Sequence, residues 1–111
     1  MEILPNVSLA ERTSMKIGGP AHAFARLQTK RDVEEACMIA HERHLPLVVL
    51  GSGTNTIFAD STIKALVVTV TAAEFEVRRS GQVMVHAGMT LATLISELAK
   101  HDLDLSALAG I

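Results

Sequence analysis

The sequence predicts an α+β fold in two parts, a parallel α/β unit followed by the beginning of an antiparallel unit. Residues 21–50 read as a strand, a helix and a second strand, and this order implies a parallel pair of strands with a right-handed crossover. Beyond residue 71 the apolar residues alternate in two short runs on either side of Ser80-Gly81, which is typical of a hairpin. We therefore expect a first subdomain over 1–71 and an incomplete second subdomain over 72–111.

The first part begins with a segment, residues 1–20, that is expected to be irregular and to end in the turn Gly18-Gly19-Pro20. A strand is predicted over 21–28. Thr29 and Asp32 then form a capping-box pattern that starts a helix. Its apolar face is expected to contain Val33, Ala36, Cys37 and Ala40.

The position of Cys37 on that apolar face predicts a buried structural thiol. The run Leu47–Leu50 is continuously apolar, as in a strand that is covered on both faces, and 66–70 predicts a further strand. In the second part we expect a hairpin over 74–86 and a helix capped by Thr90. The apolar stripe of that helix consists of Leu91, Leu94, Ile95 and Leu98. Four methionines, Met15, Met38, Met84 and Met89, are expected to fill the core.

The composition excludes several classes of function. The chain has 111 residues with 10 Lys plus Arg and 12 Asp plus Glu, so it offers no basic surface for a nucleic acid or an anionic membrane. Aromatic residues make up 3%, too few for a platform on which bases stack. The single cysteine rules out an internal disulfide and a thiolate metal cage. No secretory signal is evident, so a cytoplasmic location is expected.

The loop Gly51–Asn55 is the segment that could carry chemistry. It follows the apolar strand directly, and its glycines would let backbone N–H groups turn toward one point and approach an anion closely. Its short polar side chains add donors, so the pattern suits a pyrophosphate. It lacks the third glycine and the immediate helix of a Rossmann fingerprint, and it lacks the lysine of a Walker loop. By contrast, His41 and His44 have no third partner at a clear spacing, and no metal site is expected.

Four segments together resemble a known family. They are KIGGPA (16–21), LVVLGSGTN (47–55), VHAGMTLATL (85–94) and LSALAGI (105–111). In order and spacing they are similar to the N-terminal part of the bacterial UDP-N-acetylenolpyruvoylglucosamine reductase family, also called UDP-N-acetylmuramate dehydrogenase. The resemblance implies the FAD-binding fold of vanillyl-alcohol oxidase and p-cresol methylhydroxylase, here truncated.

The resemblance also implies which residues bind the cofactor. The residues that it assigns to the FAD pyrophosphate are Gly51, Ser52, Gly53, Thr54 and Asn55. The Gly88 turn and the strip Ala109, Gly110 and Ile111 would approach FAD from the second subdomain.

The parent reaction implied is the reduction of UDP-N-acetylglucosamine enolpyruvate by NADPH through FAD, a step of peptidoglycan synthesis. The family's catalytic serine, glutamate and arginine would lie beyond residue 111. We therefore expect no catalytic residue in this chain, which would be a fragment, a truncated product or one piece of a split protein. Two alternatives remain open: a subunit of another flavoprotein oxidase of this fold, or a non-catalytic fragment that binds no flavin.

Two further expectations follow. Replacement of Gly53 by valine should abolish flavin binding and leave the parent folded, because the side chain would fill the space of a phosphate. The second subdomain should be less stable than the first, since an antiparallel sheet that stops after two strands leaves an open edge and an uncovered helix stripe. The isolated chain is therefore expected to self-associate.

Overall fold

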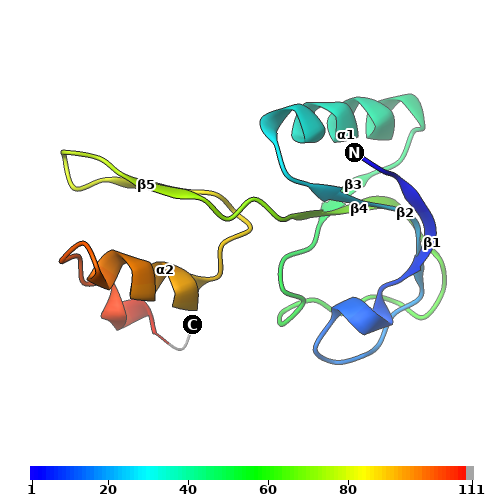
Figure 1. Cartoon of the computed structure of the whole chain (residues 1–111). Coiled ribbons are helices and arrows are strands. Elements are labelled where there is room, and N and C mark those ends of the chain that lie inside the picture. The colour runs from blue at the N-terminus through cyan, green and yellow to red at the C-terminus, as the bar shows by residue number, and fades with distance from the viewer. Residues whose placement is uncertain (110–111) are drawn as a thin grey trace. The chain divides into compact units, whose positions relative to one another are not determined.

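The computed structural model describes residues 1–109, and the chain divides into two units, Met1–Val70 and Thr71–Ile111 (Figure 1). The first unit holds a four-stranded sheet of order β1-β2-β4-β3. Its strands are β1 (Leu4–Ser8), β2 (Pro20–Leu27), β3 (Leu47–Val49) and β4 (Ile63–Val70). The strand β1 runs antiparallel to β2, while β2 and β3 both run parallel to β4. The predicted α+β class is therefore confirmed.

Three features of this sheet correct the expectations. Residues 1–20 are not irregular throughout, because they contain β1 and the 3-10 helix η1 (Ala10–Arg12). The strands β2 and β3 run parallel as predicted, but β4 lies between them. The strand β3 is thus an edge strand and is not covered on both faces, since Leu47 is 37% and Val49 68% exposed. The doubly covered strand is β4, whose residues Ala65–Val68 are all buried.

Two apolar clusters lie on the two faces of this sheet. On one face, α1 (Lys30–Glu42) contributes Ala36 and Ala40, which pack against side chains of β2 and β4. On the other face, Leu9 and Leu50 join Phe24 and the intervening side chains of β2 and β4. The register of β2 against β4 shifts between Ala21 and Ala23, and this irregularity brings Ala21 and Phe24 into the same cluster.

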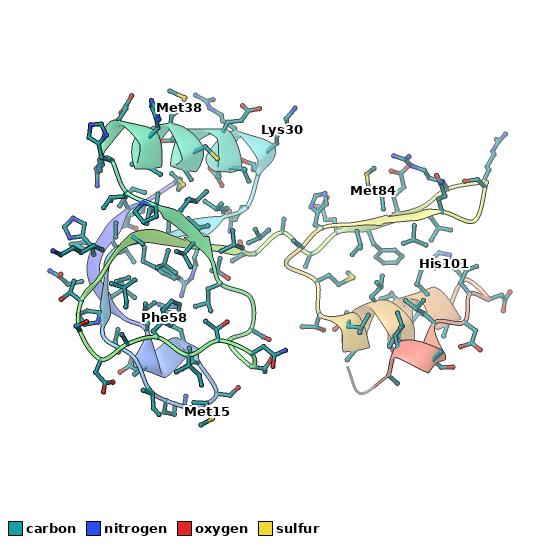
Figure 2. All side chains as sticks on the ribbon, turned by 180° about the vertical axis from the view of Figure 1, so that it is seen from behind. Met15, Lys30, Met38, Phe58, Met84 and His101 are labelled. Carbon is teal, nitrogen blue, oxygen red and sulfur yellow. The ribbon has the colours of Figure 1, made fainter. Side chains whose placement is uncertain are left out.

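The outer face of α1 carries residues that the helical pattern placed inside. Cys37 is exposed, and Val33 is 41% exposed, because the small side chains of Ala36 and Ala40 alone make the closest contact with the sheet. Met38 is 61% exposed and points away from the sheet in Figure 2. Met15 and Met84 are also exposed, so the prediction that these methionines fill the core is wrong for all three, while Met89 is half-buried.

The second unit consists of a hairpin and a helix. The strand β5 (Phe75–Val77) pairs antiparallel with β6 (Val83–Val85), and α2 (Leu91–Ala99) follows, with η2 (Ser106–Leu108) after it. Figure 1 shows α2 alongside the hairpin. The ring of His101 meets that of Phe75 edge-on with centroids 5.9 Å apart, and Leu98 is 3% exposed. The helix stripe is therefore covered in part, with Leu98 buried and Leu91, Leu94 and Ile95 half-buried.

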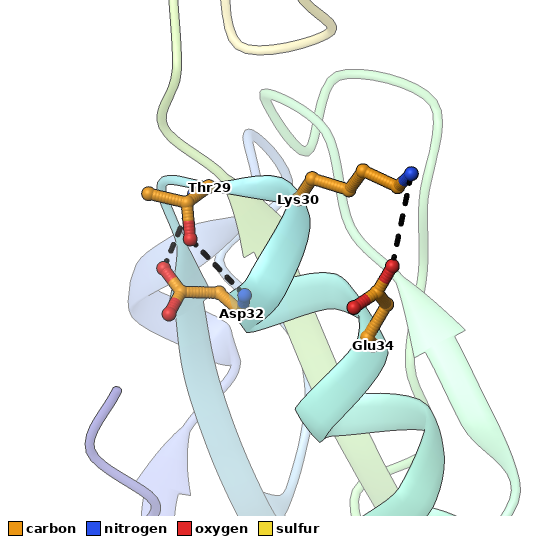
Figure 3. Close-up of polar contacts among 4 residues, drawn as sticks. All are labelled: Thr29, Lys30, Asp32 and Glu34. Carbon is orange, nitrogen blue, oxygen red and sulfur yellow. Dashed lines mark hydrogen bonds and ion pairs between the residues drawn. The ribbon is translucent and has the colours of Figure 1, made fainter.

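The start of α1 has the capping box that the sequence predicts (Figure 3). The Thr29 hydroxyl accepts a hydrogen bond from the Asp32 backbone N–H at 3.1 Å. In return the Asp32 carboxylate accepts from the N–H groups of Gln28 at 2.8 Å and Thr29 at 3.2 Å. These bonds, that of Gln28 first, lower the pKa of Asp32 below its ordinary value of 3.8.

This pKa gives a pH-dependent contribution to stability. Because the folded pKa of Asp32 is depressed, the carboxylate stabilises the fold above its unfolded pKa, and the contribution is lost as the pH falls through the folded value. The Asp32→Asn variant should therefore be less stable than the unsubstituted chain at neutral pH. The difference in their free energies of unfolding should shrink as the pH falls below 3.8. Urea unfolding between pH 2.5 and 7 measures this, with Asp60→Asn as an exposed control. A difference that stays constant over this range would contradict it.

The open strand edges bear on self-association. Among residues 1–109, β3 has a strand partner on one side only, as do both strands of the hairpin. We expect the chain to form a dimer or a larger assembly in light scattering. Met84→Lys, on β6, should shift it toward the monomer, whereas Met38→Lys, on α1, should not. A monomer at high concentration with slow amide exchange throughout 74–101 would overturn this prediction.

Candidate functional site

The loop Gly51–Asn55 begins where β3 ends, at the carboxyl edge of the two parallel strands β3 and β4. Leu50 anchors its first end, because its side chain is 2% exposed and its N–H donates to the Val68 carbonyl at 2.8 Å. Ligands of open parallel sheets bind at this edge, where the loops diverge from the strands. The fold therefore presents the predicted loop at a position suited to a ligand.

The backbone donors of the loop are free. Within the described part of the chain, no N–H group from Gly51 to Asn55 donates a hydrogen bond to another residue. The only side-chain contact in the loop joins the hydroxyl oxygens of Ser52 and Thr54 at 3.4 Å, and both residues are exposed. A run of unpaired amides beside short hydroxyl side chains is suited to bind an anion.

The two glycines of the loop have different surroundings. A Cβ atom built on Gly51 meets nothing within 4 Å, so this face of the loop is open. Gly53 is buried with a φ of +79°, and its Cβ would lie 2.1 Å from the Arg12 carbonyl oxygen and 2.8 Å from the Thr13 Cα. The Gly53 carbonyl also accepts a hydrogen bond from the Ser14 N–H at 3.0 Å. Position 53 thus requires a glycine because any side chain there would collide with the backbone of Arg12 and Thr13.

This contact corrects the expected behaviour of Gly53→Val. The side chain would collide with the backbone of Arg12 and Thr13, so the variant would lose the shape of the loop before any ligand was present. We therefore expect Gly53→Val to be destabilised, so a loss of flavin binding in it would not report on the ligand alone. Gly51 is the position whose substitution would face a ligand directly.

The turn before β2 contacts the segment that follows the loop, residues 59–61. Gly19 is buried, and a Cβ there would lie 2.0 Å from the Ser61 carbonyl oxygen and 2.8 Å from that of Asp60. Its N–H donates to the Ala59 carbonyl at 2.7 Å. Close backbone contacts at Gly19 and Gly53 therefore fix residues 9–19 against 51–61; we call these two contacts the glycine clasp. The Gly-Gly pair was the sequence signal for it, although sequence reasoning found only a turn.

A cavity of about 360 Å³ opens between these two segments. Arg12, Ser14 and Lys16 line it together with Leu50–Ser52 and with Phe24 from β2. Gly51 and Ser52 belong to the cavity wall, so the first part of the loop lies at the border of the cavity. The residues from the segment before β2 were missed by sequence reasoning, since nothing in their local pattern marks them as a binding wall.

Arg12 is the notable charge in this cavity. Its guanidinium lies 4.2 Å from the ring centroid of the buried Phe24, a cation–π contact. The side chain is half-buried, and neither of the two ion pairs found among residues 1–109 involves it. The guanidinium therefore retains donors that no carboxylate of the described chain satisfies.

The other residues assigned to FAD belong to the second unit. Gly88 lies in the turn after β6 and donates its N–H to the Ala72 carbonyl at 2.9 Å. Ala109 is exposed and follows η2, with its N–H directed to the Ser106 carbonyl at 2.9 Å. Gly110 and Ile111 lie outside the described residues. The structure thus brings Gly51–Asn55 together in the first unit, while Gly88 and Ala109 remain predictions.

Metal ligands and membrane spans were also sought over residues 1–109. No group of three or more His, Cys, Asp or Glu side chains there is placed to hold a metal ion. His41 lies in α1 and His44 follows it with a φ of 52°, outside the helix. None of the helices described has the length and apolar character that a membrane crossing requires.

Comparison with known proteins identifies the family. The profile of the FAD binding domain family matches residues 21–110. The chain is 32% identical over 112 residues to UDP-N-acetylenolpyruvoylglucosamine reductase of Treponema pallidum, which covers 96% of this chain and 32% of that protein. It is 29% identical over 103 residues to the enzyme of the same name from Moorella thermoacetica, covering 93% of this chain and 34% of that protein.

A solved structure shows the same fold. The crystal structure of UDP-N-acetylenolpyruvylglucosamine reductase from Thermus caldophilus matches with a TM-score of 0.69 at 24% identity, over 99% of this chain and 37% of that one. The chain spans about a third of the length of the relatives that it matches. The predicted FAD-binding fold of the vanillyl-alcohol oxidase type is confirmed. With a family match over most of its residues, the chain belongs to the FAD binding domain family and is homologous to UDP-N-acetylenolpyruvoylglucosamine reductases over about a third of their length.

Proposed function

We propose that this chain is the FAD-binding portion of an NADPH-dependent reductase of peptidoglycan synthesis. The parent would convert UDP-N-acetylglucosamine enolpyruvate to UDP-N-acetylmuramate in the cytoplasm. The names of the relatives support this substrate class. The observation that carries the cofactor assignment is the loop Gly51–Asn55, with free amides and an open Gly51, at the border of a cavity.

The residues present fit the diphosphate of FAD. Its charged oxygens need several donors that converge without a bulky side chain between them, and the open face of Gly51 meets that need. Ser52, Thr54 and Asn55 would add side-chain donors, since all three are exposed. The cavity of about 360 Å³ accommodates this part of a dinucleotide. In the parent, bound FAD would supply the hydride chemistry.

The share of the relatives' length that the chain covers suggests which tasks its residues perform. Residues 1–71 would form the first FAD-binding subdomain and 72–111 the start of the second, with Gly88 and the strip Ala109–Ile111 contributing from there. The chain matches about a third of the length of its relatives, and we assign no catalytic residue to it. The role of the residues described is to hold and orient the cofactor, while substrate binding and proton transfer belong to the remainder of the parent.

Paired glycine variants test the assignment of the loop. Gly51→Val should keep the parent's melting temperature and weaken FAD binding at least tenfold, because the branched side chain would stand between the amides and the diphosphate. Gly53→Ala should instead lower the stability by more than about 1 kcal/mol, since the residue has a left-handed φ and no room for a Cβ. Flavin fluorescence and thermal unfolding measure the two effects.

Gly81→Val is the matched control for these variants. Gly81 is also exposed, and a Cβ there meets nothing within 4 Å, but it lies in the hairpin turn. Its variant carries the strain of a positive φ without touching the loop, so FAD binding should be unchanged. Equal FAD affinity in Gly51→Val and the parent would contradict the assignment of the loop.

The isolated chain should not oxidise NADPH in the presence of the enolpyruvyl substrate. A reaction of this kind needs a proton donor and a substrate held opposite the flavin, and we assign neither to these residues. Absorbance at 340 nm with saturating FAD measures the consumption. The control is a full-length relative under the same conditions. Consumption that depends on the substrate would show that the chain contains more of the active site than we propose.

A further inference from the structure

The cavity beside the loop has a second wall with its own charge. The 3-10 helix η1 and the turn after it contribute Arg12, Ser14 and Lys16 to the same cavity as Leu50–Ser52. These residues precede position 21, where the match to the FAD binding domain family begins. Their contribution to the cavity is therefore a feature of this structure beyond the part of the chain that the family profile describes.

We propose that Arg12, which lines the same cavity as Gly51 and Ser52, is a further ligand of the FAD diphosphate. This inference rests on the proposed FAD-binding function. The guanidinium is half-buried, lines the cavity and has no carboxylate partner among residues 1–109. A partly desolvated cation gains most from an anion that it can contact with two N–H groups, and a diphosphate offers paired oxygens for such contacts.

Two contacts within the chain restrict the position of Arg12. Its guanidinium lies over the ring of Phe24, which is 1% exposed and belongs to the strand β2. Its backbone is fixed as well, because its carbonyl oxygen lies against Gly53 and the Ser14 N–H donates to the Gly53 carbonyl. The contact at Gly53 therefore holds the backbone of Arg12 beside the loop. The contact with Phe24 reduces the side-chain freedom that Arg12 would lose on binding.

The other charges of the cavity decide the sign of its field. Lys16 and Glu11 also line it, and both are exposed. Two cationic groups and one anionic group leave the cavity with a net positive charge. Lys16 is in a turn with a φ of 56°, closed by its N–H to the Thr13 carbonyl at 3.2 Å. Its ammonium would add a weaker and more screened attraction than the half-buried guanidinium.

The test measures binding of three probes to the full chain by calorimetry: FAD, riboflavin, which lacks phosphate, and inorganic pyrophosphate. Arg12→Gln should weaken FAD and pyrophosphate at least tenfold and leave riboflavin unchanged. Arg12→Lys should recover part of the affinity, because it restores the charge without the planar fork. Arg31→Gln is the control, since Arg31 is exposed on α1, which packs on the opposite face of the sheet.

Arg12 also supports Phe24, so the melting temperature of each variant is compared first. If Arg12→Gln is unfolded, Lys16→Gln and Arg12→Lys carry the test. Both should weaken pyrophosphate severalfold, and the loss in Lys16→Gln, which removes a charge, should grow as the salt concentration falls. Unchanged FAD and pyrophosphate affinity in folded Arg12→Gln, or in both substitute variants, would overturn the assignment of Arg12 and leave the FAD-binding function intact.

The remaining outcomes separate the two proposals. Pyrophosphate that binds in an Arg12-dependent way, without FAD binding, would uphold Arg12 as a diphosphate ligand and refute the proposed function of the chain. In that case UDP is the second source of a diphosphate, and competition between UDP and pyrophosphate would assign the site to the sugar nucleotide instead of FAD. A chain that binds neither FAD nor pyrophosphate would overturn both proposals.

Discussion

The candidate site depends on one close backbone contact, that of Gly53 with the carbonyl of Arg12 and the Cα of Thr13. The contact leaves no space for a side chain at position 53. The Ser14 N–H adds a hydrogen bond to the Gly53 carbonyl. With Gly53 turned inward, Gly51 and the exposed residues of the loop face outward. The inward glycine thus shapes the loop, and the outward one leaves it accessible.

The same contact explains why the two glycines have different physical roles although they stand two positions apart. In a glycine-rich loop, each glycine can be required by a ligand, by a positive φ or by neighbouring backbone, and the sequence does not distinguish these causes. Here Gly53 combines the second and third causes, while Gly51 has neither of these constraints. Substitutions at the two sites therefore report on stability in one case and on ligand access in the other.

Local features of the fold could be predicted from the sequence, whereas features that depend on distant neighbours could not. The capping box of Thr29 and Asp32 and the hairpin around Ser80-Gly81 rest on residues a few positions apart, and both form. The exposure of Val49 depends on the strand order, which inserts β4 between β2 and β3. The loop was recognised by its glycines. The cavity wall at Arg12 was not, because it forms only when residues 9–19 meet the loop across the chain.

The glycine clasp also has a consequence for the order of folding. Arg12 and Gly53 are about forty residues apart, so closing this contact costs the entropy of a long loop. Pairing of the strands β2 and β4 shortens that loop and forms many more contacts than the clasp, so we expect it to come first. The anion-binding loop should therefore gain its shape late, once the sheet exists. A cofactor that recognises this shape would bind only to the assembled unit. Its binding would slow unfolding and leave the rate of folding unchanged.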